Sequence, residues 1–163
     1  MSPVEVAAAV RLRLAAEIAD DRSALETLAS DIARLVAPAA DPRDEWMRGS
    51  ALAFELERFY TAVEALLTRV LRAIDGDVPS GPSSHLDIPR AASVPIDGGR
   101  PAVVTTEIAG ELRDLLKFRH LARHGYESRP QVPRLEELAR TVARVRHPLV
   151  ASLAAFDRWL RTT

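Results

Sequence analysis

The sequence contains no cysteine, a single lysine and no long uninterrupted apolar run. Without cysteine the chain can form neither a disulfide framework nor a cysteine-ligated zinc site, so histidine and carboxylate side chains are the ligands left for such a metal. The apolar stretch at residues 7–10 meets Arg11 and Arg13 too early for a signal peptide, and no stretch approaches the roughly 18 apolar residues of a membrane span. We therefore expect a soluble, cytoplasmic protein with no membrane association.

The size and net charge of the chain further limit the kinds of fold and of binding that are possible. With 163 residues, 47% of them apolar, the chain is long enough for a single domain over 1–163 with a substantial core, and it is not a mainly disordered polymer. The net charge is only −1, so any binding to nucleic acid must depend on a local basic patch. Residues 113–134 provide one, because six basic and two acidic residues give that segment a net charge of +4.

The first half of the chain has the pattern of two long helices. Residues 2–5 combine an N-cap serine, a proline at the first helical position and a glutamate at the third. A second start signal lies at residues 41–44, and Asp75-Gly76 closes that helix with a glycine suited to a left-handed conformation. The apolar positions are Leu14, Ile18, Leu25, Leu28, Ile32 and Leu35, then Leu52, Leu56, Phe59, Val63, Leu66, Val70 and Ile74. At about 1.5 Å per residue, such helices reach roughly 50 Å, which favours an elongated bundle.

A crossover follows at residues 77–104, where eight prolines and glycines prevent any long element. Within it the sequence predicts one short helix near residues 84–92, capped by Ser84 and limited by Pro89. Residues 102–104 are apolar and two of them are valine, but no second strand-like run exists to pair with them. We therefore interpret them as the approach to the next helix.

Two more helices complete the predicted fold. Thr105 or Thr106 caps the third long helix, which ends near Gly125, and a proline-bounded loop leads to a last helix with a kink at Pro148. The fold class is therefore all-α, an elongated up-and-down bundle of four main helices and a short crossover helix. We expect His147 to be a surface or kink residue and Tyr60 to lie at the edge of the core. Near helix ends, Trp46 and Trp159 are expected to be packing residues.

The most informative segment is residues 119–126, Arg-His-Leu-Ala-Arg-His-Gly-Tyr, at the end of the third long helix. Arginine carries a permanent charge for a phosphate, histidine titrates near neutral pH, and tyrosine adds a phenolic hydroxyl. Successive residues of an ideal helix turn by about 100°, so Arg119 and His124 point roughly 140° apart. Either the helix loosens before Gly125, or Arg119 reaches a cleft that a second subunit shares.

The same residues can also have purely structural or metal-binding roles. His124 could interact with the last carbonyls of its helix, and Lys117, Arg119 and Arg123 could be solvated cations near a helix C-terminus. A zinc site on His120 and His124 needs a third ligand, for which Glu127 or His85 could serve, and the sequence has no His-Glu-x-x-His pattern. We therefore predict no metal site and no cofactor.

The spacing of Arg119, His124 and Tyr126 resembles the Arg-x(4 to 6)-His-x-Tyr signature of HEPN-superfamily ribonucleases of the HepT type. Residues 56–64 resemble the second-helix segment of that family, and Ile74-Asp75-Gly76 precedes a proline-rich crossover with a histidine, as in the family. A last helix with an internal proline also fits. The resemblance covers roughly residues 50–160. The chain departs from it in the crossover, where Pro89 and Ala91-Ala92 replace a more regular apolar helix.

This resemblance implies an all-α bundle that dimerises through its motif-bearing helices, so that two Arg-His pairs face one cleft. It also implies metal-independent cleavage of RNA, with Arg119 and His124 as the catalytic residues. The substrate-binding residues would be Lys117, His120, Arg123 and Tyr126.

HepT-type proteins act as toxins of type VII-like toxin–antitoxin pairs, beside a small nucleotidyltransferase antitoxin, MntA, that adds AMP to the motif tyrosine. By resemblance, Tyr126 is the acceptor in this chain. Two other functions stay open. One is a non-catalytic helical module of the same fold that binds a partner or a nucleotide, and the other is a histidine-assisted metal site.

Overall fold

The computed structural model describes the backbone of residues 3–81, 83–124 and 131–163, and the side chains of these residues except 3–6 and 117–124. In this part of the chain all regular structure is helical and no β-strand is assigned. The elements are α1 (Pro3–Leu35), the 3-10 turn η1 (Pro42–Asp44), α2 (Glu45–Ile74), α3 (Ser84–Ser93), α4 (Thr106–His124) and α5 (Val132–Thr162). The predicted all-α fold is confirmed.

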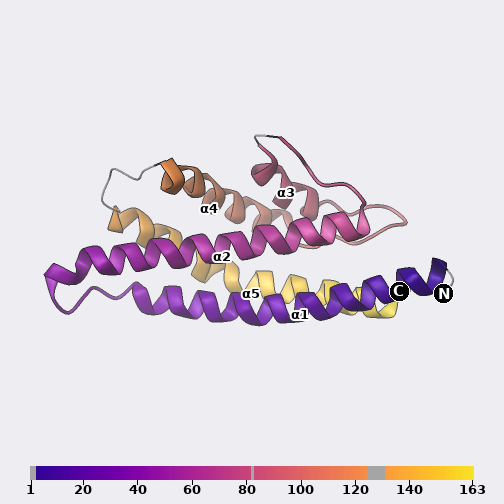
Figure 1. Ribbon diagram of the computed structural model, residues 1–163, viewed down its shortest axis with the longest axis horizontal. Helices are drawn as coiled ribbons and strands as arrows, with labels where there is room; N and C mark the ends of the chain where they lie inside the picture. Colours follow the sequence, from indigo (N-terminus) through magenta and orange to yellow (C-terminus); the bar gives the residue numbers. More distant parts are fainter. Residues whose placement is uncertain (1–2, 82, 125–130) are drawn as a thin grey trace.

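The three longest helices lie side by side along the long axis of the molecule (Figure 1). α1 packs against α2 and α5, while the shorter α3 and α4 lie on the other side of α2, where α4 also contacts α5. Buried apolar side chains from all five α-helices form one cluster, with Phe59 and Phe156 among its largest fully buried members. The predicted elongated bundle is therefore present. No helix among the described residues is both long and apolar enough to cross a membrane.

The predicted start and end of α2 are confirmed, with one refinement at the start. The carboxylate of Asp41 accepts a hydrogen bond from the Arg43 backbone N–H at 2.9 Å and caps η1, and α2 begins directly after this turn. At the other end the N–H of Asp75 donates to the Leu71 carbonyl at 2.8 Å, and Gly76 takes a φ of 75°. A residue with a Cβ would adopt that left-handed conformation at a cost, so glycine suits the turn.

The short helix α3 corrects two predictions. Its N-cap position is Ser83 rather than Ser84, and the Ser83 hydroxyl donates to the Asp87 carboxylate at 3.0 Å. The helix also continues through Pro89 to Ser93, so Pro89 does not limit it. Proline removes one backbone donor, whereas burial of Ile88 and Ala92 against the core stabilises the remaining turn.

Arg100 holds the crossover against the end of α2. Arg100 is only 3% exposed. Its guanidinium forms a two-point ion pair with Asp75, with Nε···Oδ1 at 2.6 Å and Nη2···Oδ2 at 2.7 Å. The same guanidinium donates to the carbonyls of Ala91 at 3.2 Å and Val94 at 3.0 Å, which lie at the C-terminal end of α3. One buried charge therefore joins the ends of α2 and α3 shortly before α4 begins.

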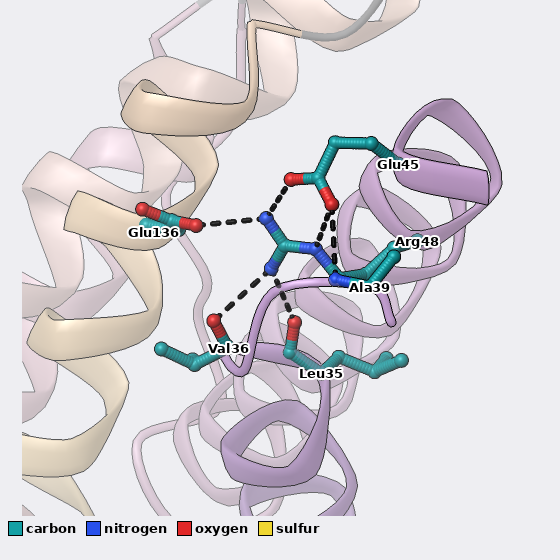
Figure 2. A network of polar contacts seen from close by, with 6 residues as sticks. All are labelled: Leu35, Val36, Ala39, Glu45, Arg48 and Glu136. Atoms are coloured by element: carbon teal, nitrogen blue, oxygen red, sulfur yellow. Dashed lines mark hydrogen bonds and ion pairs between the residues drawn. The ribbon is translucent and has the colours of Figure 1, made fainter. Parts of the chain in front are cut away.

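Arg48 joins the ends of neighbouring helices at the opposite end of α2 (Figure 2). It is only 8% exposed, and its Nη1 donates to the carbonyls of Leu35 at 2.7 Å and Val36 at 3.1 Å, the last residue of α1 and the residue after it. The guanidinium also pairs with Glu45 through Nε and Nη2, and Nη2 reaches Glu136 of α5 at 2.8 Å. The hydrogen bonds to Glu45, more than those to Glu136, raise the pKa of Arg48 above its ordinary value. Three helices thus meet on one cation.

The aromatic and histidine residues outside the motif match their predictions with one exception. Tyr60 is buried, His147 is exposed, and the half-buried ring of Trp159 lies 5.2 Å from the ring of Phe156, as predicted. Trp46 is 60% exposed, so the prediction that it is a packing residue is wrong. Its helix begins with an apolar side chain facing outward.

We predict that Arg48→Met lowers the free energy of unfolding by about 3 kcal/mol, because Glu45, Glu136 and two carbonyls lose their buried partner. The matched control is Arg34→Met. Arg34 pairs with Asp31 three residues earlier, as Arg48 pairs with Glu45, but its side chain is 74% exposed. Such a surface pair contributes about 1 kcal/mol or less. Urea denaturation of the three proteins measures both losses, and equal small losses would contradict a structural role for Arg48.

Candidate functional site

The helix that carries the motif begins at a well-defined cap. The Thr105 hydroxyl oxygen accepts a hydrogen bond from the Ile108 backbone N–H at 3.3 Å, which settles the choice between Thr105 and Thr106. Just before it, Val103 and Val104 are fully buried, and the N–H of Val103 donates to the Ala92 carbonyl of α3 at 2.9 Å. Residues 102–104 are therefore the approach to α4, as predicted, and α3 fixes the point where α4 starts.

The first three turns of α4 are packed into the bundle. Its buried side chains are Ile108, Ala109, Leu112, Leu115 and Leu116. They lie on one side of the helix, which contacts α2, α3 and α5. On the outer side, Arg144 of α5 pairs with Glu111 of α4 at 3.0 Å. These contacts fix the direction in which α4 runs toward the motif.

The motif residues occupy the last turns of α4. The helix continues to His124, so the backbone of Lys117, Arg119, His120, Arg123 and His124 is helical. The alternative in which the helix loosens between Arg119 and His124 therefore has no support, whereas the alternative of a cleft shared with a second subunit does not require such loosening.

The side chains of residues 117–124 lie outside the described part of the chain, as do Tyr126 and Glu127 as a whole. The predicted roles of the six site residues consequently stay predictions. The sequence and the helical register still show where one row of α4 changes from apolar to basic residues. An ideal helix extends the row of buried positions 108, 112 and 116 to positions 119 and 123, and both of these are arginine. The motif begins where the apolar row of α4 ends.

A row of acidic residues on α2 was missed by the sequence analysis. Glu57 and Glu64 are half-buried and lie seven residues apart, with the buried Tyr60 between them. All three residues take part in polar or ring contacts. They lie on the side of α2 away from Arg69, which pairs with Asp21 of α1 at 2.6 Å. The spacing of seven residues is visible in the sequence, but the half-burial that distinguishes this row is not.

The described residues provide no support for a histidine-assisted metal site. His85, one of its possible ligands, is half-buried in the first turn of α3, and Glu127 is outside the described residues. Among the described side chains, no three histidine, aspartate or glutamate residues gather as a metal-binding group.

Comparison with known proteins identifies a protein family. A family model described as "HepT-like protein" matches residues 51–160, two thirds of the chain. No curated protein and no solved structure matches the chain. The matched span begins in α2, includes the crossover and all of α4, and ends in the last turns of α5. It contains Arg119, His124 and Tyr126, and it agrees with the span of the resemblance seen in the sequence.

We predict that Thr105→Ala lowers the free energy of unfolding by about 1 kcal/mol at neutral pH through loss of the α4 cap. The neighbouring Thr106→Ala serves as the matched control and should have a smaller effect.

The Glu107 carboxylate accepts hydrogen bonds from its own N–H and from the Thr105 hydroxyl, which lower its pKa below 4.5. A lowered pKa stabilises the fold above pH 4.5, and this stabilisation disappears as the pH falls through the folded-state pKa. The difference between native protein and Thr105→Ala should therefore shrink in acid, as urea titrations at several pH values can check.

Proposed function

Since this chain belongs to the HepT-like protein family, of the HEPN type, we propose that it is a metal-independent endoribonuclease whose active cleft is shared by two copies. The observation that carries the proposal is the position of the motif. Arg119, His124 and Tyr126 keep the Arg-x4-His-x-Tyr spacing inside the matched span, and the first two lie on the last turns of α4. We further infer that the protein acts in the cytoplasm.

The reaction needs a base, an acid and a source of positive charge. The ribose 2′-oxygen attacks the adjacent phosphorus, and the bond from phosphorus to the 5′-oxygen breaks. The products are a 2′,3′-cyclic phosphate and a 5′-hydroxyl. His124 removes the 2′-hydroxyl proton or supplies a proton to the leaving 5′-oxygen, a contribution of about 10² to 10⁴ in rate. With two copies at one cleft, one histidine can serve each step.

Arg119 stabilises the charge that accumulates on the phosphorane oxygens, an interaction that is stronger in the transition state than in the ground state. Because Arg119 and His124 point roughly 140° apart on one helix, each arginine is better placed to serve the shared cleft than its own histidine. The RNA backbone is bound by Lys117, His120, Arg123 and Tyr126. The net charge of +4 over residues 113–134 supports this assignment.

A covalent modification can switch such a site off. We propose that the protein is the toxin of a type VII-like pair and that an MntA-type nucleotidyltransferase modifies Tyr126. The phenolic oxygen attacks the α-phosphorus of ATP, pyrophosphate leaves, and the phenolic proton is released. The attached phosphate then brings negative charge next to Arg119 and His124, where it competes with the phosphate of the RNA substrate.

Cleavage of labelled single-stranded RNA tests the nuclease proposal. We expect the native protein to cleave in EDTA and to leave cyclic-phosphate and 5′-hydroxyl ends. His124→Ala and Arg119→Ala should each reduce the rate by about 10² or more. An RNA with a 2′-deoxy sugar at the cleaved position should resist, because it lacks the nucleophile. His147→Ala is the matched control, since His147 is exposed on α5, far along the sequence from the motif.

The outcomes separate the candidate functions. Cleavage that survives both motif substitutions excludes this mechanism, and cleavage abolished by EDTA favours a histidine-assisted metal site. RNA or nucleotide binding without cleavage favours the non-catalytic module.

Incubation with an MntA-type nucleotidyltransferase and ATP tests the modification. We expect AMP on the peptide that contains Tyr126, together with loss of RNA cleavage. The chain has only one other tyrosine, Tyr60, which is buried and provides the matched control. Tyr126→Phe should resist modification and Tyr60→Phe should accept it, as mass spectrometry can show. Modification of the Tyr126→Phe protein would exclude Tyr126 as the acceptor.

A further inference from the structure

Trp46, the second residue of α2, stands largely outside the packed core. It is 60% exposed, and among the described side chains its indole contacts neither another ring nor a guanidinium. The other tryptophan, Trp159, packs against Phe156 with the ring centres 5.2 Å apart. An indole left in water forgoes the stabilisation that burial would give, so Trp46 is a candidate for binding something outside the chain.

Trp46 lies on a side of α2 that is covered further along the helix. On an ideal helix, positions 46, 53, 57 and 64 fall within about 40° of one another, whereas Arg69, which pairs with α1, lies about 140° from Trp46. Ala53 packs against the core, and Glu57 and Glu64 are half-buried. Trp46 is therefore the uncovered end of this side of α2.

This uncovered end lies at the same end of the bundle as the motif. α4 lies on the side of α2 away from α1 and ends over the N-terminal half of α2 (Figure 1). Arg48, two residues after Trp46, reaches Glu136 in the second turn of α5 at 2.8 Å. Trp46 is therefore near the end of the helix that carries Arg119 and His124 and near the start of the helix that follows the motif.

The charges near Trp46 favour an uncharged ligand group. The three arginines of residues 41–58 are each paired with a carboxylate, Arg43 with Asp41, Arg48 with Glu45 and Arg58 with Glu55. Trp46 thus offers a flat, uncharged surface, while residues 113–134 carry a net charge of +4. A ligand that fits both surfaces has an anionic backbone with flat, uncharged groups attached to it, which is the chemistry of a single-stranded nucleic acid.

We propose that Trp46 stacks on an unpaired base of the RNA that the motif binds, an inference that rests on the proposed function. Every base has a π face, so the indole can accept any of them. In a duplex both faces of a base are covered by its neighbours, and the contact therefore requires a single-stranded segment. The substrate class that follows is RNA with an unpaired base near the cleaved bond.

Phe54 provides a comparison within the same helix. It is also 60% exposed, but its ring already lies 5.8 Å from the Arg58 guanidinium. On an ideal helix it is turned about 80° from Trp46, and it lies opposite the buried side of α2. Phe54 is therefore an exposed aromatic residue of α2 that faces away from the motif-bearing helix.

Tryptophan fluorescence detects the stacking directly, because the chain has only two tryptophans. The Trp159→Phe protein retains only Trp46. The Trp46→Phe protein retains only Trp159, in the last turn of α5, which finishes at the opposite end of the bundle (Figure 1). The ligand is a single-stranded 2′-fluoro RNA, which lacks the attacking hydroxyl and is not cleaved. We expect it to quench the emission of Trp46 and to leave that of Trp159 unchanged.

Affinity measurements separate stacking from phosphate contacts. With the same RNA, fluorescently labelled, Trp46→Ala should raise the dissociation constant about tenfold or more, and Trp46→Phe should recover much of the affinity. Trp46→Ala should leave the salt dependence of binding unchanged, whereas Lys117→Ala should reduce its logarithmic slope by about 0.7. Phe54→Ala is the matched control and should bind like the native protein. A fully paired duplex should bind equally to the native protein and to Trp46→Ala.

The outcomes keep the stacking apart from the nuclease activity. RNA binding without quenching of Trp46, or equal losses in Trp46→Ala and Phe54→Ala, overturns the stacking whatever the activity. Cleavage of natural RNA without such quenching retains the nuclease and rejects the stacking. Quenching without cleavage retains the stacking and rejects the nuclease. If Trp46→Ala fails to fold by circular dichroism, the quenching in Trp159→Phe decides the question, because that protein keeps Trp46.

Discussion

The buried charge of Arg48 determines how the long helices of this protein meet. Its guanidinium takes the last free carbonyls at the end of α1, the carboxylate of Glu45 at the start of α2, and Glu136 in the first turns of α5. A charge in this position is stable only while all these partners stay in place. Since α5 begins shortly after the motif segment, the contact with Glu136 also fixes where the chain resumes beyond the motif.

Arg100 acts at the other end of the same segment. It joins Asp75 to the carbonyls that end α3, and α3 in turn holds Val103 just before the cap of α4. The chain from Thr105 to Glu136 is therefore anchored at both ends by buried arginines, with the apolar side of α4 against the core between them. The basic residues of the motif follow on the last turns of that helix, beyond its apolar row.

The parts of the fold that depend on neighbouring residues were predictable from the sequence. Asp41, Gly76 and Thr105 mark helix ends through bonds or turns made within a few residues, so local chemistry reveals them. α3 was harder, because the stability of its turn around Pro89 comes from burial and from Arg100. Arg48 looks like any other arginine in the sequence, since its partner Glu136 lies 88 residues away. The outward position of Trp46 likewise depends on tertiary packing, which decides the faces of α2 that the other helices leave uncovered.

For the candidate site, the spacing from Arg119 to Tyr126 and its likeness to a family were visible in the sequence. The α2 row of Glu57 and Glu64 became apparent only from burial, because spacing alone does not show which helix a carboxylate faces.

The pairing of α1 with α5 has a consequence for how the protein is made. α1 has its most extensive contacts with α5, the last helix of the chain, and Arg22 of α1 reaches Asp157 of α5. During synthesis α1 can meet α2 early, but α5 emerges from the ribosome only after α2, α3 and α4. Contacts between helices so far apart in the sequence raise the contact order, which slows folding. Until α5 has emerged, part of the α1 apolar surface therefore has no partner within the chain.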